Sequence, residues 1–82
     1  MNVTVLYFAG LCDKTNCREE RFELGEEAVL RNLQKKILAR HSDLEEMAPR
    51  VRWAINETYA VNPDTPLSQG DQIALIPPVS GG

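Results

Sequence analysis

The sequence predicts an α+β domain in which a mixed β-sheet packs on one main helix. Three observations support this fold class. Residues 2–9 and 72–76 are short apolar runs rich in β-branched or aliphatic side chains, which are typical of strands. Between residues 26 and 40, apolar residues recur with the period of a helix. The chain has 82 residues, a length that suits one small domain.

The first two strands are expected near the start of the chain. Both alternating faces of residues 2–9 are largely apolar, which favours a central strand over an edge strand. Residues 10–16 are expected to form a loop. Residues 17–24 are predicted to form a second, more exposed strand, in which Phe22 and Leu24 share a face with Glu20.

The main helix is expected over residues 26–40. Three apolar residues recur at i, i+3 and i+7 and therefore form one stripe: Leu30, Leu33 and Ile37. Leu6 or Phe8 of the first strand is expected to pack on this stripe and complete the core. Glu26 and Glu27 would lie in the first turn, where the helix dipole favours negative charge.

Basic residues follow in the second half of the predicted helix. Positions 31–40 hold four basic residues and no acidic one, and we interpret them as a solvated face that complements the dipole. One or two further helical turns are expected over residues 43–48, ending near Pro49.

The remaining strands are expected in the second half of the chain. Val51, Trp53 and Ile55 alternate with other residues, which predicts a third strand with Trp53 in the core or at an interface edge. The later elements, in chain order, are a turn at 56–57, a short strand at Tyr59–Val61, a tight turn at 68–71 and a last strand at 72–76.

The predicted order of elements has a known three-dimensional form. A mixed sheet that curls round one helix is the β-grasp, or ubiquitin-like, arrangement. Pro77 and Pro78 cannot donate hydrogen bonds to a sheet, so regular pairing is expected to stop there. We therefore expect a single domain over residues 1–76 and a projecting C-terminal tail over 77–82.

Charge and hydropathy argue against several classes of function. The net charge is −3, from 12 acidic and 9 basic residues, whereas nucleic-acid-binding domains usually have a basic surface. The apolar runs are far shorter than the roughly 20 residues of a membrane-spanning helix. The first ten residues also lack the basic segment of a signal peptide. We expect a cytoplasmic protein that binds neither nucleic acid nor a membrane.

Cys12 and Cys17 are the two cysteines, and both are expected to be free thiols in a polar loop. A zinc site needs about four ligands, and the single histidine, His41, is far from both cysteines in sequence. No metal site is therefore expected. A plant-type iron–sulfur cluster is excluded because it needs four cysteines.

The last eleven residues, 72–82, contain no charged side chain and end in Gly81-Gly82. Proline stiffens the exit from the sheet, and glycine removes the side chain. An extended segment from Pro77 to Gly82 would reach roughly 20 Å. Such a narrow, neutral tail suits the insertion of its terminal carboxylate into a pocket of another protein.

Several segments together resemble a known family. They are residues 73–82 (IALIPPVSGG), Pro66-Leu67, Gly70-Asp71, residues 5–9 (VLYFA) and residues 54–56 (AIN). These segments are similar to the small subunits of molybdopterin synthase, in the MoaD/ThiS class of ubiquitin-like sulfur carriers. Many members have an arginine and an acidic residue just after the first strand, where this chain has Cys12-Asp13. That departure puts any partner contact through the arginine in doubt.

The resemblance implies that Gly82 carries sulfur. Its ionised carboxylate is a poor electrophile, so an ATP-dependent adenylyltransferase would first convert it to an acyl adenylate. Sulfur would then replace AMP and leave a thiocarboxylate, with no cofactor stably bound. The tail would enter the large subunit of molybdopterin synthase and donate sulfur to a pyranopterin precursor, which builds the dithiolene. The complex of the two subunits is expected to be a heterotetramer. The residues that would thread into that subunit are Pro77, Pro78, Val79, Ser80 and Gly81.

The resemblance also implies that the chain is a sulfur donor without catalytic side chains of its own. Both partners are expected to bind the sheet surface near the root of the tail, because one helix covers only one face of the sheet. Phe8, Leu67 and Ile76 are the candidate anchors. Cys12 and Cys17 are not expected to carry the transferred sulfur.

Other functions remain open at this point. Within the carrier class, the alternatives are the carrier of the thiamine pathway and the modifier of tRNA thiolation. Outside it, the chain could be a protein modifier that forms isopeptide bonds through Gly82, or a plain β-grasp interaction module. The ending Pro-Pro-Val-Ser-Gly-Gly favours the molybdopterin carrier.

Overall fold

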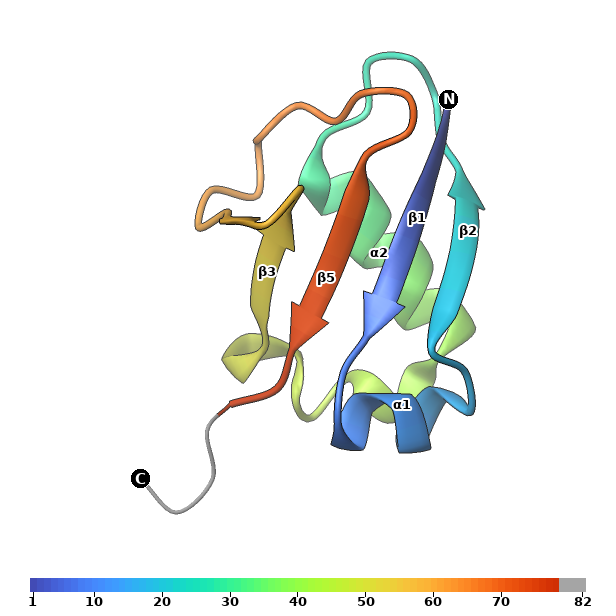
Figure 1. Ribbon diagram of the computed structural model, residues 1–82, viewed down its shortest axis with the longest axis vertical. Coiled ribbons are helices and arrows are strands. Elements are labelled where there is room, and N and C mark those ends of the chain that lie inside the picture. The colour runs from blue at the N-terminus through green and yellow to red at the C-terminus, as the bar shows by residue number, and fades with distance from the viewer. Residues whose placement is uncertain (79–82) are drawn as a thin grey trace.

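A computed structural model describes residues 1–78, and five strands form one mixed sheet in the order β2-β1-β5-β3-β4. The strands are β1 (Asn2–Tyr7), β2 (Glu19–Glu23), β3 (Arg52–Ile55), β4 (Thr58–Tyr59) and β5 (Gln72–Ile76). β1 and β5 are parallel, and the other neighbouring pairs are antiparallel. The main helix, α2 (Leu30–Arg40), crosses one face of the sheet (Figure 1). The β-grasp arrangement is confirmed.

The main helix begins at Leu30, not at Glu26 as predicted. Val29 has an extended backbone and forms an isolated β-bridge with Pro66, so the chain is held in an extended conformation just before the helix. Glu26 and Glu27 therefore lie outside the helix, and the predicted placement of acidic residues in its first turn is wrong. Tertiary pairing with a loop that is distant in sequence decides where α2 begins.

The segment between β1 and β2 is a short helix, α1 (Gly10–Thr15), where a loop was predicted. Leu11 and Thr15 are one turn apart and are both buried, and the Thr15 hydroxyl donates to the Leu11 carbonyl at 3.0 Å. The helix ends at Asn16, whose φ of 60° lies in the left-handed region that asparagine tolerates. The prediction was wrong because Leu11 is the one large apolar residue in an otherwise polar segment.

The connection from α2 to β3 contains the helical turns that were predicted, but with different bounds. They are two 3-10 helices, η1 (Ser42–Leu44) and η2 (Ala48–Arg50), whereas the turns were predicted over residues 43–48. Pro49 lies in the first turn of η2 and does not end the segment. Proline is tolerated there because the first turn of a helix needs no N–H donor from that residue.

The core lies between α2 and one face of the sheet. The predicted helix residues are buried: Leu30, Leu33 and Ile37. The residues of β1 that join them are Val3, Val5 and Tyr7. Leu6 is half-buried and Phe8 is exposed, so the assignment of either residue to the core is wrong. Both faces of β1 are apolar, and hydropathy alone could not show which face meets the helix.

The remaining strands agree with the prediction to within about two residues at each end. β4 spans Thr58–Tyr59, and Val61 lies outside it with 95% of its surface exposed. Trp53 is half-buried and packs against the core, as expected. Within residues 1–78, none of the helices has the length and apolar character needed to cross a membrane.

Both predicted turns are confirmed. Asn56 and Glu57 have φ values of 49° and 72°, as in the tight type I′ turn of a two-residue hairpin. Asp71 donates its backbone N–H to the Ser68 carbonyl at 3.1 Å, and Gly70 between them has a φ of 85°. The second turn leads directly into β5, the strand that precedes the tail.

Candidate functional site

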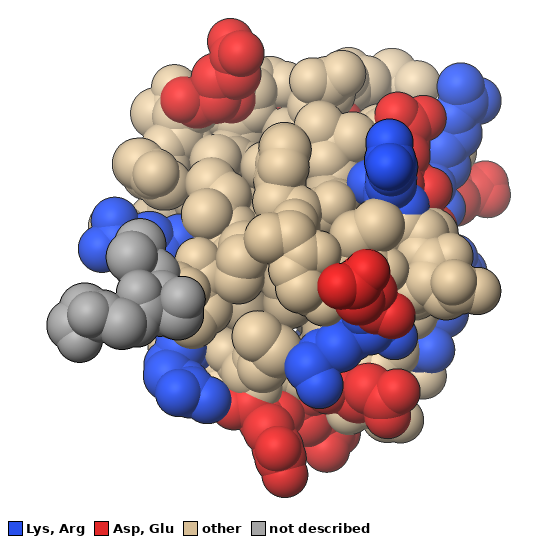
Figure 2. Space-filling model, turned by 60° about the horizontal axis from the view of Figure 1, so that its bottom comes forward, with Lys and Arg blue, Asp and Glu red and all other residues tan. Residues whose placement is uncertain are grey.

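The face of the sheet opposite α2 carries a band of apolar side chains. Six of them line a hollow of about 300 Å³, which we call the outer groove: Leu6, Phe8, Ala54, Tyr59, Ala74 and Ile76. The strand register explains this arrangement, because Ala74 of β5 pairs with Leu6 on one side and with Ala54 on the other. Figure 2 shows a broad area of uncharged side chains on this side of the molecule.

Two aromatic side chains in the outer groove are unusually exposed. Phe8 has 48% and Tyr59 has 60% of its surface accessible to solvent. The guanidinium of Arg52 lies over the Tyr59 ring, 5.8 Å from its centre. Exposed apolar patches on small proteins often mark protein interfaces, and aromatic residues often dominate their binding energy. The outer groove therefore has the composition of a docking surface.

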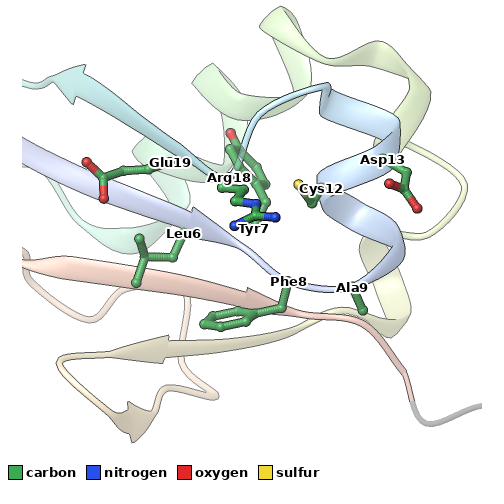
Figure 3. A pocket seen from close by; sticks show the side chains of 8 residues that line it. All are labelled: Leu6, Tyr7, Phe8, Ala9, Cys12, Asp13, Arg18 and Glu19. Atoms are coloured by element: carbon green, nitrogen blue, oxygen red, sulfur yellow. The ribbon is translucent and has the colours of Figure 1, made fainter.

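A second hollow adjoins the outer groove at the end of β1 (Figure 3). Its volume is about 540 Å³, and it shares Leu6 and Phe8 with the groove. Cys12 of α1 and Arg18 also line this hollow, and Figure 3 shows their side chains around it. Arg18 and Cys12-Asp13 therefore line one hollow, next to the outer groove.

The root of the tail lies at the end of β5, beside the end of the parallel strand β1 (Figure 1). Pro77 and Pro78 are half-buried and line a hollow together with Arg50 and Arg52. Ile76 and Tyr59 line this hollow as well as the outer groove. The root of the tail, two arginines and the apolar groove therefore form one continuous surface. The other predicted tail residues lie outside the described residues: Val79, Ser80, Gly81 and Gly82.

The structure brings together two of the three predicted anchors. Phe8 and Ile76 both line the outer groove. Leu67 is 5% exposed and belongs to the core, so its assignment to the exposed surface is wrong. Its backbone N–H donates to the Ala28 carbonyl at 3.1 Å, which fixes the loop against the segment before α2. An isolated leucine between turn residues gave no periodic signal from which its direction could be predicted.

Sequence reasoning missed Tyr59, Ala54 and Ala74 as parts of this surface. The alternation in residues 72–76 was the available signal, because it puts Ala74 on the same face as Ile76. The contribution of Tyr59 was not predictable in this way, since it depends on the register between β3 and β4.

A separate polar cluster is centred on Glu20 of β2. Its Oε1 accepts a hydrogen bond from the Tyr7 hydroxyl at 2.8 Å and lies 2.8 Å from His41 Nε2, and its Oε2 accepts one from Arg40 at 2.9 Å. Burial acts to raise the pKa of Glu20, but the hydrogen bonds from His41, Arg40 and Tyr7 outweigh it and hold that pKa below its ordinary value. Burial and the bond to Glu20 raise the pKa of Tyr7.

The position of His41 corrects the expectation that the cysteines have no histidine nearby. The sulfur of Cys17, a carboxylate oxygen of Glu20 and a ring nitrogen of His41 all lie within 4.8 Å of one another. Cys12 and Cys17 are both free thiols, as predicted, but Cys12 lies in α1 and not in a loop. The fold places the end of α2 against the start of β2, which sequence distance did not reveal.

Comparison with known proteins identifies the family. The model of the ThiS family matches residues 5–82. The chain belongs to the ThiS family. It is 37% identical over 83 aligned positions to a molybdopterin synthase sulfur carrier subunit from Chlamydomonas reinhardtii, and the match covers 100% of both chains.

Solved structures of relatives share the fold. One is a putative molybdopterin converting factor, subunit 1, from Pyrococcus furiosus, with a TM-score of 0.87, 33% identity and coverage of 96% of this chain and 99% of that one. Another comes from a complex of subunits 1 and 2 of the molybdopterin-converting factor of Helicobacter pylori, with a TM-score of 0.74, 30% identity and coverage of 100% of both chains.

Proposed function

We propose that this protein is the sulfur carrier subunit of a molybdopterin synthase and that Gly82 is its reactive residue. The observation that carries the proposal is the full-length similarity to a sulfur carrier subunit of Chlamydomonas reinhardtii, which extends through the Gly81-Gly82 end. The same similarity favours this role over a carrier for thiamine or tRNA thiolation and over a protein modifier.

The chemistry needs only the terminal carboxyl group of this chain. The Gly82 carboxylate attacks the α-phosphorus of ATP in the activating enzyme, which forms the acyl adenylate and releases pyrophosphate. A sulfur nucleophile supplied by the activating system then displaces AMP and leaves a thiocarboxylate. Activation is necessary because an ionised carboxylate is a poor electrophile at neutral pH. AMP and then sulfur are thus attached covalently and transiently to Gly82, and the chain needs no bound cofactor.

The outer groove is proposed to dock the large subunit of molybdopterin synthase. In this arrangement Phe8 and Ile76 enter the partner's surface, and the tail from Pro77 to Gly82 extends into its active site. Support comes from the exposure of Phe8 and from the continuity of the groove with the root of the tail. The related Helicobacter pylori protein forms such a pair, since subunits 1 and 2 of its molybdopterin-converting factor occur in one complex.

The arginines at the root of the tail suggest the charge of the partner. Arg50 and Arg52 stand beside Pro77 and Pro78 in a chain whose net charge is −3. An acidic rim around the partner's tail channel would complement them and orient the encounter. We propose the same surface for the ATP-dependent adenylyltransferase, so the two partners would bind in turn. The catalytic side chains then belong to the partners. Residues 1–76 form the folded domain that binds the partners and positions the tail.

Intact-mass measurement tests the proposal. The chain is expressed with and without a cognate adenylyltransferase, the activating enzyme, and is then purified. Mass spectrometry compares the intact masses of the two preparations. We expect a mass gain equal to the replacement of oxygen by sulfur, and formation of the dithiolene product when the large subunit and the pyranopterin precursor are added. Lysine-linked conjugates would indicate a protein modifier, and an unchanged mass would indicate a plain interaction module. A thiocarboxylate that yields no dithiolene would point to another sulfur pathway.

A further inference from the structure

The cluster of Cys17, Glu20 and His41 has the geometry of a metal-binding site. Its three donor atoms lie within 4.8 Å of one another. Ligand atoms around a tetrahedral zinc ion are about 3.3–3.8 Å apart, given metal–ligand bonds of about 2.0–2.3 Å. Small side-chain rotations therefore suffice to surround an ion. We propose that these three residues bind a divalent transition-metal ion, and that Zn²⁺ is the ion that they suit best.

The donor set argues for zinc. A cysteine thiolate, a histidine nitrogen and a carboxylate oxygen are the ligand types that Zn²⁺ takes in proteins. Ca²⁺ and Mg²⁺ prefer oxygen ligands alone, so the sulfur and nitrogen donors select against them. The side chains of Glu20 and His41 are 18% and 14% exposed. An ion can therefore enter from solvent, and a water molecule can occupy the fourth position.

The neighbours of the cluster orient its ligands. Arg40 donates a hydrogen bond to Oε2 of Glu20 at 2.9 Å and the Tyr7 hydroxyl donates one to Oε1 at 2.8 Å, so the carboxylate is held in place with Oε1 2.8 Å from His41 Nε2. The Tyr7 ring stands edge-on to the His41 ring, with 5.6 Å between their centres, and limits how that ring can turn. Outer partners of this kind fix the direction of metal ligands in many metal sites. The ion, the thiolate and the carboxylate together carry no net charge, so the filled site does not strongly repel Arg40.

Binding would exchange one set of contacts for another. The ion replaces the hydrogen bond between His41 Nε2 and Glu20 Oε1, which are 2.8 Å apart. The Cys17 thiol releases its proton to solvent when its sulfur binds the ion. The filled site then ties the segment before β2 to the C-terminal end of α2. This role is structural, and it does not depend on the sulfur-carrier proposal.

Cobalt absorption tests the site directly. Co²⁺ replaces Zn²⁺ in such sites, and a cobalt–thiolate bond gives a charge-transfer band in the near ultraviolet. The untagged, reduced chain is titrated with Co²⁺ beside three variants: Cys17→Ser, His41→Asn and, as the matched control, Cys12→Ser. We expect the band in the natural chain and in Cys12→Ser, its loss in Cys17→Ser, its weakening in His41→Asn, and its displacement by Zn²⁺.

A thermal measurement keeps the test independent of the spectrum. Zn²⁺ should raise the Tm of the natural chain and of Cys12→Ser by an amount that grows with its concentration, because a ligand of the folded state stabilises it. Cys17→Ser should show no rise, and circular dichroism checks that it folds. If it fails to fold, His41→Asn supplies the comparison. Absence of the cobalt band in the natural chain, or its equal loss in Cys12→Ser, would overturn the proposal.

Discussion

Ala54 and Ala74 lie opposite each other across β3 and β5, on the face of the sheet that α2 leaves open. Their short side chains leave the outer groove open between Leu6 on one side and Tyr59 on the other. In the proposed complex, the space above these two small residues would receive the partner's side chains. The groove is therefore a consequence of side-chain size in two paired strands as much as of hydrophobicity.

Filling the groove should weaken docking without unfolding the domain. Ala74→Met places a longer apolar side chain in the hollow, while Ile73 and Leu75 continue to fill the core on the opposite face. We expect the affinity for the large subunit to fall at least about tenfold, which is about 1.4 kcal/mol. Thr4→Met is the matched control, because Thr4 is half-buried in β1 but does not line the groove. Titration calorimetry measures both variants, and equal affinities would argue against docking in the groove.

Phe8→Asp should act more strongly on the same interface. Phe8 is 48% exposed, so a charge at this position leaves the core intact while it puts a carboxylate against the partner's apolar surface. A central aromatic anchor typically contributes about 2 kcal/mol or more, which corresponds to a loss of affinity of roughly thirtyfold. Val61→Asp provides the control, because Val61 is more exposed and does not line the groove. Undiminished capture of the large subunit by Phe8→Asp would remove Phe8 from the binding site.

Leu33→Ala tests how α2 is seated on the sheet. Leu33 is fully buried in the stripe that faces β1 and β5, and its truncation leaves a cavity in a small core. We expect the free energy of unfolding to fall by about 2–4 kcal/mol. Leu38→Ala, at a half-buried position of the same helix, should cost clearly less. Urea denaturation compares the two, and a loss below about 0.5 kcal/mol for Leu33→Ala would contradict the packing described above.

Patterns that repeat along the chain could be predicted from the sequence. The stripe of Leu30, Leu33 and Ile37 repeats with the helical period and has one buried face, so its position followed from spacing alone. Ile76 was named as an anchor because residues 72–76 carry more apolar side chains than one helix can cover, and it does line the outer groove. The Gly81-Gly82 end carried the family resemblance before any geometry was known.

Features that depend on contacts between distant segments could not be predicted. The first residue of α2 is determined by the bridge between Val29 and Pro66, which no local pattern indicates. The first strand is apolar on both faces, so the sequence could not show which face packs on α2. In the structure, Tyr7 faces the core and Phe8 is exposed. The approach of His41 to Cys17 is also tertiary, because the end of α2 meets the segment before β2 only in the folded chain.

The two cysteines are expected to be dispensable for sulfur transfer. The double variant Cys12→Ser, Cys17→Ser should still gain a thiocarboxylate at its terminus, because the reacting carbon belongs to Gly82 and not to a thiol. Intact mass after co-expression with the activating enzyme measures this outcome. Circular dichroism serves as the folding control. Loss of thiocarboxylate formation in a folded double variant would instead indicate that a persulfide on one of these thiols relays the sulfur.

Deletion of Gly82 should abolish sulfur transfer and leave stability unchanged. The deletion moves the terminal carboxylate back by one residue, about 3.3–3.6 Å, whereas a displacement reaction requires near-contact geometry between the reacting atoms. Residue 82 lies outside residues 1–78, so its removal takes away none of the core contacts described above. A matched variant with one residue added after Gly82 relocates the reactive carbon in the opposite direction and should fail in the same way.

The Gly82 test depends on two readouts taken together. We expect the Tm of both tail variants to stay within about 2–4 °C of the natural chain, because surface changes away from packed regions cost at most about 0.5 kcal/mol. The yield of dithiolene product should fall to background in both. A defect in the core would lower stability and yield together, as Leu33→Ala should, and that variant is the comparison for the test. Near-normal product from the Gly82 deletion would rule out Gly82 as the residue that carries the sulfur.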